Sequence, residues 1–229
     1  MDYPILTCGD SALTVKVGDG ISPEVHERVV SFCTALQRAG IAGIRELVPT
    51  YDSVCVHYDP WILSEEQFRS LLRAMPVSAG AAQNVATPRT VRIPVCYGGE
   101  YGPDLAAVAA HAGMTEQEIV EIHGSGRYLT YMLGFLPGFA YLGGMDERIA
   151  CPRLKTPRAN IPAGSVGIAG KQTGIYPLSS PGGWQLIGRT PRKLFHFTEE
   201  TAQFLLSAGD LVEFYPISPE EYVRMEEDA

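Results

Sequence analysis

A glycine-rich segment, residues 162–177, carries side chains of this 229-residue chain that are well suited to contact a ligand. Gln172, Thr173 and Tyr176 offer hydrogen-bonding groups, and glycines such as Gly170 let a ligand approach the backbone amides. The pattern fits a binding loop and, equally, a glycine-rich hairpin whose polar side chains face solvent. Periodicity alone does not separate these two interpretations.

The same segment looks at first like a phosphate-binding loop. A Walker A loop follows the pattern GxxxxGK[ST], in which the last residue binds magnesium. Here five residues separate Gly164 from Gly170, and Gln172 follows Lys171. We therefore do not assign ATP binding to this loop.

Residues 180–191 bring an aromatic residue, Trp184, and a guanidinium group, Arg189, to one short strand. Arg189 can bind a carboxylate through two parallel hydrogen bonds, which would suit a small acidic substrate. A structural ion pair with an acidic side chain is the equally weighted alternative, because arginine is the usual choice for both roles.

Two phenylalanines occupy residues 134–142, a stretch that also contains Pro137 and Gly138. Such a loop can line a binding cleft, or Phe135 and Phe139 can plug one end of a barrel. Composition favours the plug, because large aromatic rings are usually buried.

His123 stands at the end of an expected helix, before Gly124, Ser125 and Gly126. A neutral histidine can act as an acid or base, but no carboxylate at a recognisable spacing accompanies it, so a cap or packing role is favoured. The chain contains no HExxH or CxxC motif and no serine-nucleophile elbow. We expect no metal site, and we expect reduced thiols at the five widely spaced cysteines: Cys8, Cys33, Cys55, Cys96 and Cys151.

The elements that must position these residues begin with a small α+β unit. Alternation predicts strands near residues 13–17, 45–48 and 53–58. Capping residues and apolar stripes predict helices over residues 22–40 and from Ser64 to Met75. Helices that cover one face of a sheet give an α/β sandwich.

A linker is predicted at residues 78–88, which are small, polar and without periodicity. It divides an α/β domain, residues 1–87, from a second domain, residues 88–229. In the second domain, glycine and proline recur from residue 134 to residue 191 and exclude long helices. Many short strands joined by tight turns predict a β-barrel or sandwich, which residues 194–197 and 211–215 would close.

The formal net charge of -8 argues against nucleic acid as a partner, because an acidic protein repels polyphosphate. No apolar stretch approaches the roughly 18 residues of a membrane span, and the N-terminus has no secretory pattern. We therefore expect a soluble, cytoplasmic protein that does not enter membranes.

These motifs resemble the family that includes the B subunit of 5-oxoprolinase, the KipI kinase inhibitor and allophanate hydrolase subunit 1. The long C-terminal motifs carry most of the resemblance, and residues 9–13, 48–51 and 58–60 add a weaker N-terminal match. The resemblance implies a ferredoxin-like α/β domain followed by a cyclophilin-like β-barrel. It also implies that this chain acts with a homologue of the C subunit and with a third 5-oxoprolinase subunit to open 5-oxoproline to glutamate.

In that family ATP is consumed by the assembled complex, so we expect no tightly bound cofactor and little activity from this chain alone. The resemblance marks a substrate-binding set and leaves the catalytic group open among Gln172, Arg189 and His123. Lys171 stands where the family often has glycine. The implied substrate-binding residues are Phe135, Pro137, Gly138, Phe139, Gly170, Gln172, Thr173, Tyr176, Trp184 and Arg189.

Two other functions stay open for this family. A KipI-like chain binds a sensor histidine kinase and needs an exposed apolar patch for it. Membership of a urea carboxylase or allophanate hydrolase complex is the third possibility, and its biotin would have to arrive on another protein.

Overall fold

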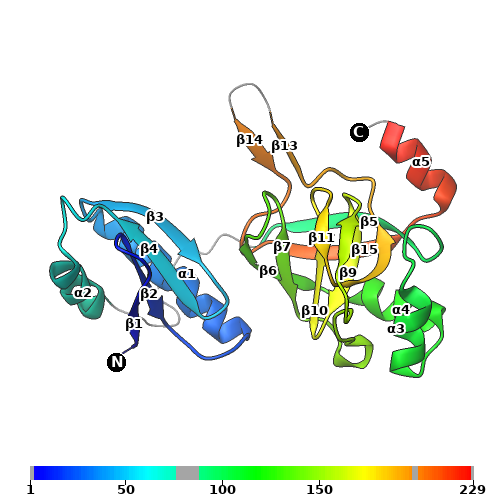
Figure 1. The fold of residues 1–229 in the computed structure, drawn as a ribbon, viewed down its shortest axis with the longest axis horizontal. Coiled ribbons are helices and arrows are strands. Elements are labelled where there is room, and N and C mark those ends of the chain that lie inside the picture. The colour runs from blue at the N-terminus through cyan, green and yellow to red at the C-terminus, as the bar shows by residue number, and fades with distance from the viewer. Residues whose placement is uncertain (1–2, 76–87, 198–200, 228–229) are drawn as a thin grey trace. The chain divides into compact units, whose positions relative to one another are not determined.

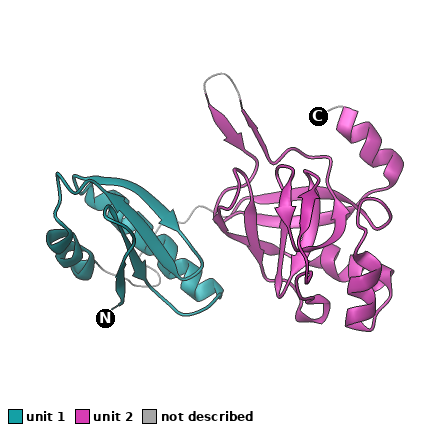
Figure 2. Ribbon diagram, viewed as in Figure 1, with its two compact units in different colours: residues 1–87 teal, residues 88–229 magenta. Residues whose placement is uncertain are grey.

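The computed structural model describes residues 3–75, 88–197 and 201–227. The chain divides into two compact units, Met1–Thr87 and Pro88–Ala229 (Figure 2). The predicted linker at residues 78–88 lies almost entirely outside the described residues.

The N-terminal unit is an antiparallel sheet of four strands in the order β1-β2-β4-β3. Its elements in chain order are β1 (Ile5–Thr7), β2 (Ala12–Lys16), α1 (Pro23–Ala39), β3 (Ile44–Pro49), β4 (Ser53–Tyr58) and α2 (Glu65–Ala74). The run from β2 to α2 is the βαββα part of a ferredoxin-like fold, and β1 pairs with β2 at the sheet edge. The expected α/β fold is confirmed, and β1 is an added strand that was too short to predict.

The predicted helix boundaries of this unit follow from local capping. The Ser22 side chain accepts a hydrogen bond from the Val25 amide, and Gly40 ends α1 in the left-handed conformation with φ 55°. Ser64 and Gln67 form the predicted capping box of α2. Both helices bury apolar side chains that include Phe32 and Phe68.

The C-terminal unit is a closed barrel of seven strands in the order β10-β7-β6-β15-β5-β12-β9 (Figure 1). β15 and β5 run parallel, whereas the other neighbours run antiparallel. The predicted barrel is therefore confirmed. Its strands are β5 (Thr90–Tyr97), β6 (Tyr128–Leu133), β7 (Ala140–Gly143), β9 (Ser165–Ala169), β10 (Gln172–Ile175), β12 (Gln185–Arg189) and β15 (Leu211–Pro216).

Further elements surround the barrel. Helices α3 (Leu105–Ala112), α4 (Glu116–Ser125) and α5 (Pro219–Glu227) flank it, together with a short 3-10 turn at Glu147–Ile149. Two small sheets complete the unit, one from β8 (Arg158–Ile161) and β11 (Ser180–Gly182), the other from β13 (Phe195–Phe197) and β14 (Ala202–Phe204).

One predicted barrel strand is wrong. Residues 211–215 do close the barrel as part of β15, but Phe195–Phe197 pairs with Ala202–Phe204 in a hairpin outside it. The apolar residues of β13 do alternate, but they pack against each other and against β14 within the hairpin. Leu194 and Leu206, at the two ends of the hairpin, are the residues that enter the barrel core.

Candidate functional site

The outer face of the barrel carries a cluster of three aromatic side chains that the sequence had singled out. Phe139 lies edge-on to Tyr176 and to Trp184, with ring centroids 5.6 Å apart in both cases. All three are buried, together with Ile161 of the β8–β11 sheet. Their neighbours Ala140 and Ile175 belong to the barrel core instead, as strand alternation requires.

The glycines beside this cluster are explained by packing. A Cβ atom on Gly174 would stand 3.1 Å from the Trp184 ring and 3.3 Å from the Phe139 ring. A Cβ atom on Gly167 would stand 3.1 Å from Trp184 Cβ. The glycine-rich pattern of residues 162–177 thus arises partly because a tryptophan side chain packs closely against β9 and β10.

The Phe135 loop differs from the plug that composition favoured. Phe139 is buried in the outer cluster and does not fill a barrel end. Phe135 lies edge-on to Phe139 with ring centroids 5.6 Å apart, and its side chain is 63% exposed. It is the one non-glycine residue with positive φ (68°) among the described residues, a strained conformation for a bulky side chain. Pro137 is exposed in the same loop.

Arg189 lies between Cys96 of β5 and Ser165 of β9 in the strand register of the barrel. Ser165 of β9 pairs with Arg189 of β12, and its carbonyl accepts a hydrogen bond from the amide of Tyr176. Ser165 Oγ and Arg189 Nε are both buried without a hydrogen-bond partner among the described residues. The guanidinium of Arg189 lies over the Tyr101 ring, 5.8 Å from its centroid. No acidic side chain pairs with Arg189 in the described part of the chain.

Two further arginines border the aromatic cluster, and sequence reasoning missed both. Arg153 lies over the Trp184 ring at 6.0 Å, and Arg158 donates to Asp104 at 2.7 Å. Burial raises the pKa of the Tyr176 hydroxyl, and both guanidinium groups oppose this shift. The sequence feature that could have indicated these arginines is local charge, because residues 151–160 contain several basic residues in an otherwise acidic chain. Arginines beside a buried aromatic floor can bind a small carboxylate.

The turn that joins β9 to β10 holds Gly170 at φ 58°, as the first central residue of a two-residue hairpin turn. Lys171, the second, donates to Glu147 at 2.7 Å in an exposed ion pair. Gln172 follows, paired with Ala169 across the hairpin. The hairpin interpretation of this segment therefore holds for its backbone.

Thr173 and His123 lie together in the barrel core, not on the outer face. Thr173 donates to the Gly167 carbonyl, so its oxygen accepts from His123 Nε2 at 2.9 Å. His123 Nδ1 then accepts from the Tyr97 hydroxyl at 2.7 Å, and the imidazole stacks on Phe214. Burial lowers the pKa of His123 to about 3, so the imidazole is neutral at physiological pH.

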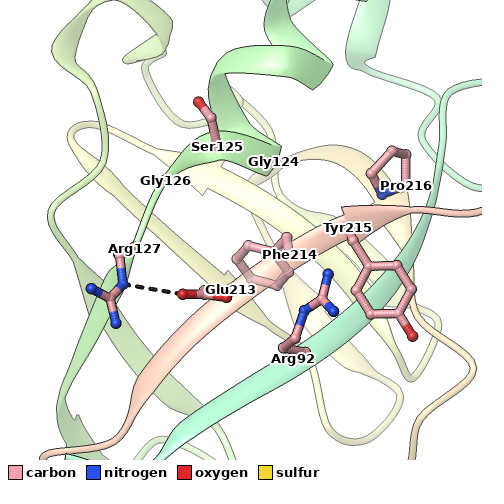
Figure 3. Close-up of a pocket in the computed structure, with 9 residues that line it drawn as sticks. All are labelled: Arg92, Gly124, Ser125, Gly126, Arg127, Glu213, Phe214, Tyr215 and Pro216. Atoms are coloured by element: carbon pink, nitrogen blue, oxygen red, sulfur yellow. Dashed lines mark ion pairs between the residues drawn. The ribbon is translucent and has the colours of Figure 1, made fainter.

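A separate pocket of about 350 Å³ opens beside the end of α4 (Figure 3). Arg127 pairs with Glu213 at 3.1 Å across it, and Arg92 lies over the Tyr215 ring. Its described lining includes none of the predicted site residues.

A family model described as the carboxyltransferase domain, subdomain C and D, matches residues 3–206. The chain belongs to this family. It is 43% identical over 236 residues to the B subunit of 5-oxoprolinase from Bacillus subtilis, covering 99% of this chain and 98% of that one. The resemblance seen in the motifs is therefore confirmed along the whole chain.

Two solved structures contain the fold of this carboxyltransferase-family chain as one part of a longer protein. The crystal structure of TTHA0988 matches with a TM-score of 0.77 at 36% identity, over 90% of this chain and 40% of that one. The Kluyveromyces lactis urea amidolyase matches with a TM-score of 0.79 at 20% identity, over 98% of this chain and 15% of that one. The chain thus spans less than half the length of either protein.

Within the described part of this carboxyltransferase-family chain, no group of three His, Cys, Asp or Glu side chains is arranged to hold a metal ion. Its described helices include none that is long and apolar enough to cross a membrane.

Proposed function

We propose that this chain is the B subunit of an ATP-dependent 5-oxoprolinase, which opens 5-oxo-L-proline to L-glutamate together with partner subunits. The observation that carries this proposal is the end-to-end similarity to the 5-oxoprolinase B subunit of Bacillus subtilis. A local feature supports it, because the guanidinium of Arg189 lies over the Tyr101 ring on the outer face of the barrel. That combination suits a small substrate with one carboxylate and an apolar ring.

The proposed roles follow from the positions of the side chains. Arg189 has no acidic partner among the described residues, so it can orient the substrate carboxylate or lactam. Phe139, Tyr176 and Trp184 form a rigid aromatic base, and Gln172 of the hairpin supports charge that develops during ring opening. Thr173 and His123 hold the barrel core in register beneath this surface and stay remote from the substrate.

The remaining chemistry is assigned to the assembly. The chain shows no Walker A pattern, so we expect a partner subunit to hold the ATP that the complex consumes. A homologue of the C subunit and a third 5-oxoprolinase subunit are the proposed partners, the proposed location is the cytoplasm, and no tightly bound cofactor is proposed.

The test is reconstitution of the complex from purified subunits of one organism. We expect ATP-dependent release of glutamate from 5-oxoproline only when this chain and both partner subunits are present. Release of glutamate at the full rate without this chain would refute the proposal.

A second function is favoured by one observation, the shared fold with urea amidolyase. As part of a urea carboxylase or allophanate hydrolase complex, the chain would act on urea or allophanate in place of 5-oxoproline. The same reconstitution distinguishes the two when each compound is supplied in turn. A KipI-like inhibitor would instead lower the autophosphorylation of a purified sensor histidine kinase without any partner subunit.

A further inference from the structure

The β13–β14 hairpin has one apolar face and one polar face. Phe195 stacks on Phe204 across the two strands, with centroids 5.4 Å apart, and lies edge-on to Phe197. Ala202 pairs with Phe197 on the same face. On the opposite face, His196 and Gln203 hydrogen-bond to each other at 2.9 Å. The aromatic face of the hairpin is the set Phe195, Phe197, Ala202 and Phe204.

This aromatic face is left open to solvent. Phe197 is 76% exposed and Phe204 is 45% exposed. The hairpin forms its own two-stranded sheet and stands out from the barrel (Figure 1). A two-stranded hairpin is only marginally stable in water, and an exposed apolar cluster on one marks a surface for another chain.

The base of the hairpin is held firmly, so its position is set by the barrel. Leu194 and Leu206 are buried in the barrel core at the two ends of the hairpin, and the Leu205 amide donates to the Leu194 carbonyl at 2.8 Å. Arg89 donates to the Leu205 carbonyl at 2.7 Å and pairs with Asp210. The fold therefore directs this arm and leaves its outer part uncovered.

The strained Phe135 loop lies against the same arm. A Cβ atom on Gly138 would stand 2.8 Å from Phe195 Cβ, so the two segments touch. Phe135, three residues earlier, is 63% exposed at positive φ. A bulky residue held in a strained and exposed conformation indicates a constraint other than packing within the chain.

We propose that the aromatic face of the β13–β14 hairpin, together with Phe135, is the docking surface for the C-subunit homologue of the complex. This inference rests on the proposed function, and it names the surface through which that function is assembled. The partner contributes an apolar socket that removes Phe197, Phe204 and Phe135 from water.

The exposed area favours a larger partner over a second copy of this chain. At about 150–250 Å² per phenylalanine, the exposed parts of the aromatic face amount to roughly 300 Å² per copy. Two copies that met through this face would bury roughly 600 Å², whereas stable interfaces bury about 1,200–2,000 Å². The Bacillus subtilis relative is named as a subunit, so other chains belong to its enzyme, and one of them can cover the arm, Phe135 and the barrel surface beside them.

The test compares two double variants of the full chain. Each variant places two aspartates on one face of the hairpin, and the two variants use opposite faces. F197D/F204D charges the aromatic face, and H196D/Q203D is the matched control on the polar face. Each is mixed with the purified C-subunit homologue of the same organism, and association is measured by size exclusion with light scattering and by calorimetry. Glutamate release is measured separately after the third subunit is added.

We expect F197D/F204D to weaken association at least about 100-fold, because two charges would be buried in an apolar socket, while H196D/Q203D binds like the wild type. Thermal melting of each variant alone shows whether it is folded. Wild-type association that survives F197D/F204D overturns the inference, as does a wild type that never binds the C-subunit homologue. If the wild-type chain associates with itself and only F197D/F204D abolishes this, the inference is overturned and the surface binds a second copy of the chain. Hairpin-dependent assembly without glutamate release supports the inference and refutes the proposed function.

Discussion

The barrel core and the outer barrel face both contain residues that the sequence had marked as possible site residues, and they differ in how their polar groups are satisfied. In the core, Tyr97, His123 and Thr173 form a continuous chain of hydrogen bonds that ends on a backbone carbonyl. On the outer face, Ser165 Oγ and Arg189 Nε are buried without a partner among the described residues.

The difference separates stability from binding. A complete buried network fixes one arrangement of the core and leaves no group free for a ligand. A buried polar group without a hydrogen-bond partner costs free energy, and a ligand, a water molecule or a partner chain that bonds to it can offset this cost. We therefore expect substitutions in the core network to change folding and substitution of Arg189 to change activity.

The strongest expected effect on stability is that of His123→Ala. The variant leaves the Tyr97 hydroxyl without its acceptor, removes the donor to Thr173 and opens a cavity beside Phe214, so it should lower the free energy of unfolding by about 2–4 kcal/mol. Urea denaturation of the full chain measures this. His111→Ala, on the exposed end of α3, is the matched control and should change stability by less than about 0.5 kcal/mol. If the His123→Ala chain is as stable as the wild type but the complex that contains it is inactive, His123 belongs to the active site and not to the core network.

His123 also predicts a pH dependence. Burial lowers the pKa of His123 to about 3, whereas an unfolded histidine titrates near roughly 6.5. Between these values the unfolded state binds a proton that the folded state does not, so stability should fall as the pH decreases, by up to about 1.4 kcal/mol per pH unit. Comparing wild type with His123→Gln from about pH 7 to pH 4 isolates this contribution from that of the carboxylates. Parallel curves for the two proteins would contradict it.

On the outer face the largest expected effect is that of Arg189→Ala. Loss of the guanidinium should lower kcat/KM for 5-oxoproline in the assembled complex about 100-fold. The melting temperature should change little, because Arg189 makes no ion pair among the described residues. Arg192→Ala, an exposed arginine nearby in sequence, is the control and should keep full activity. Full activity of Arg189→Ala would exclude Arg189 from substrate binding.

The fold was largely readable from the sequence because its signals are local. The cap at Ser22, the capping box at Ser64 and the strand alternation at residues 53–58 each depend on neighbouring residues. Strand β1 is three residues long and depends on pairing with β2, so no periodicity could indicate it. The strand Phe195–Phe197 was predicted, but its partner was not, because pairing depends on contacts distant in sequence.

The site was less readable for the same reason. Thr173 and Tyr176 are close neighbours in one glycine-rich segment, yet strand alternation sends Thr173 into the core and Tyr176 to the outer face. Arg153 and Arg158 join the aromatic cluster only because the β8–β11 sheet covers that face. Nothing in their spacing from Trp184 indicates this contact.

A smaller effect on stability is expected from Gly174→Ala. The new Cβ atom would stand 3.1 Å from the Trp184 ring and 3.2 Å from the Ala140 carbonyl oxygen, so the aromatic cluster must shift. We expect a loss of about 1–2 kcal/mol in the free energy of unfolding. Gly124→Ala in α4, whose nearest neighbour would lie 3.8 Å away, should instead raise stability by up to about 1 kcal/mol. Equal effects of the two alanine substitutions would show that packing does not require the glycine of β10.

The smallest expected effect concerns the strained loop. Phe135→Gly removes a strain of roughly 1 kcal/mol at φ 68°, and it removes little buried surface because the ring is 63% exposed. The melting temperature of the chain should therefore stay level or rise slightly. Phe197→Gly, another exposed phenylalanine but one without positive φ, should lower it, because glycine weakens a strand. If Phe135 serves assembly, Phe135→Gly should at the same time weaken association with the C-subunit homologue. A gain in stability coupled to a loss in binding would show that the strain is maintained for the partner, whereas a loss in both would make Phe135 a packing residue of the outer cluster.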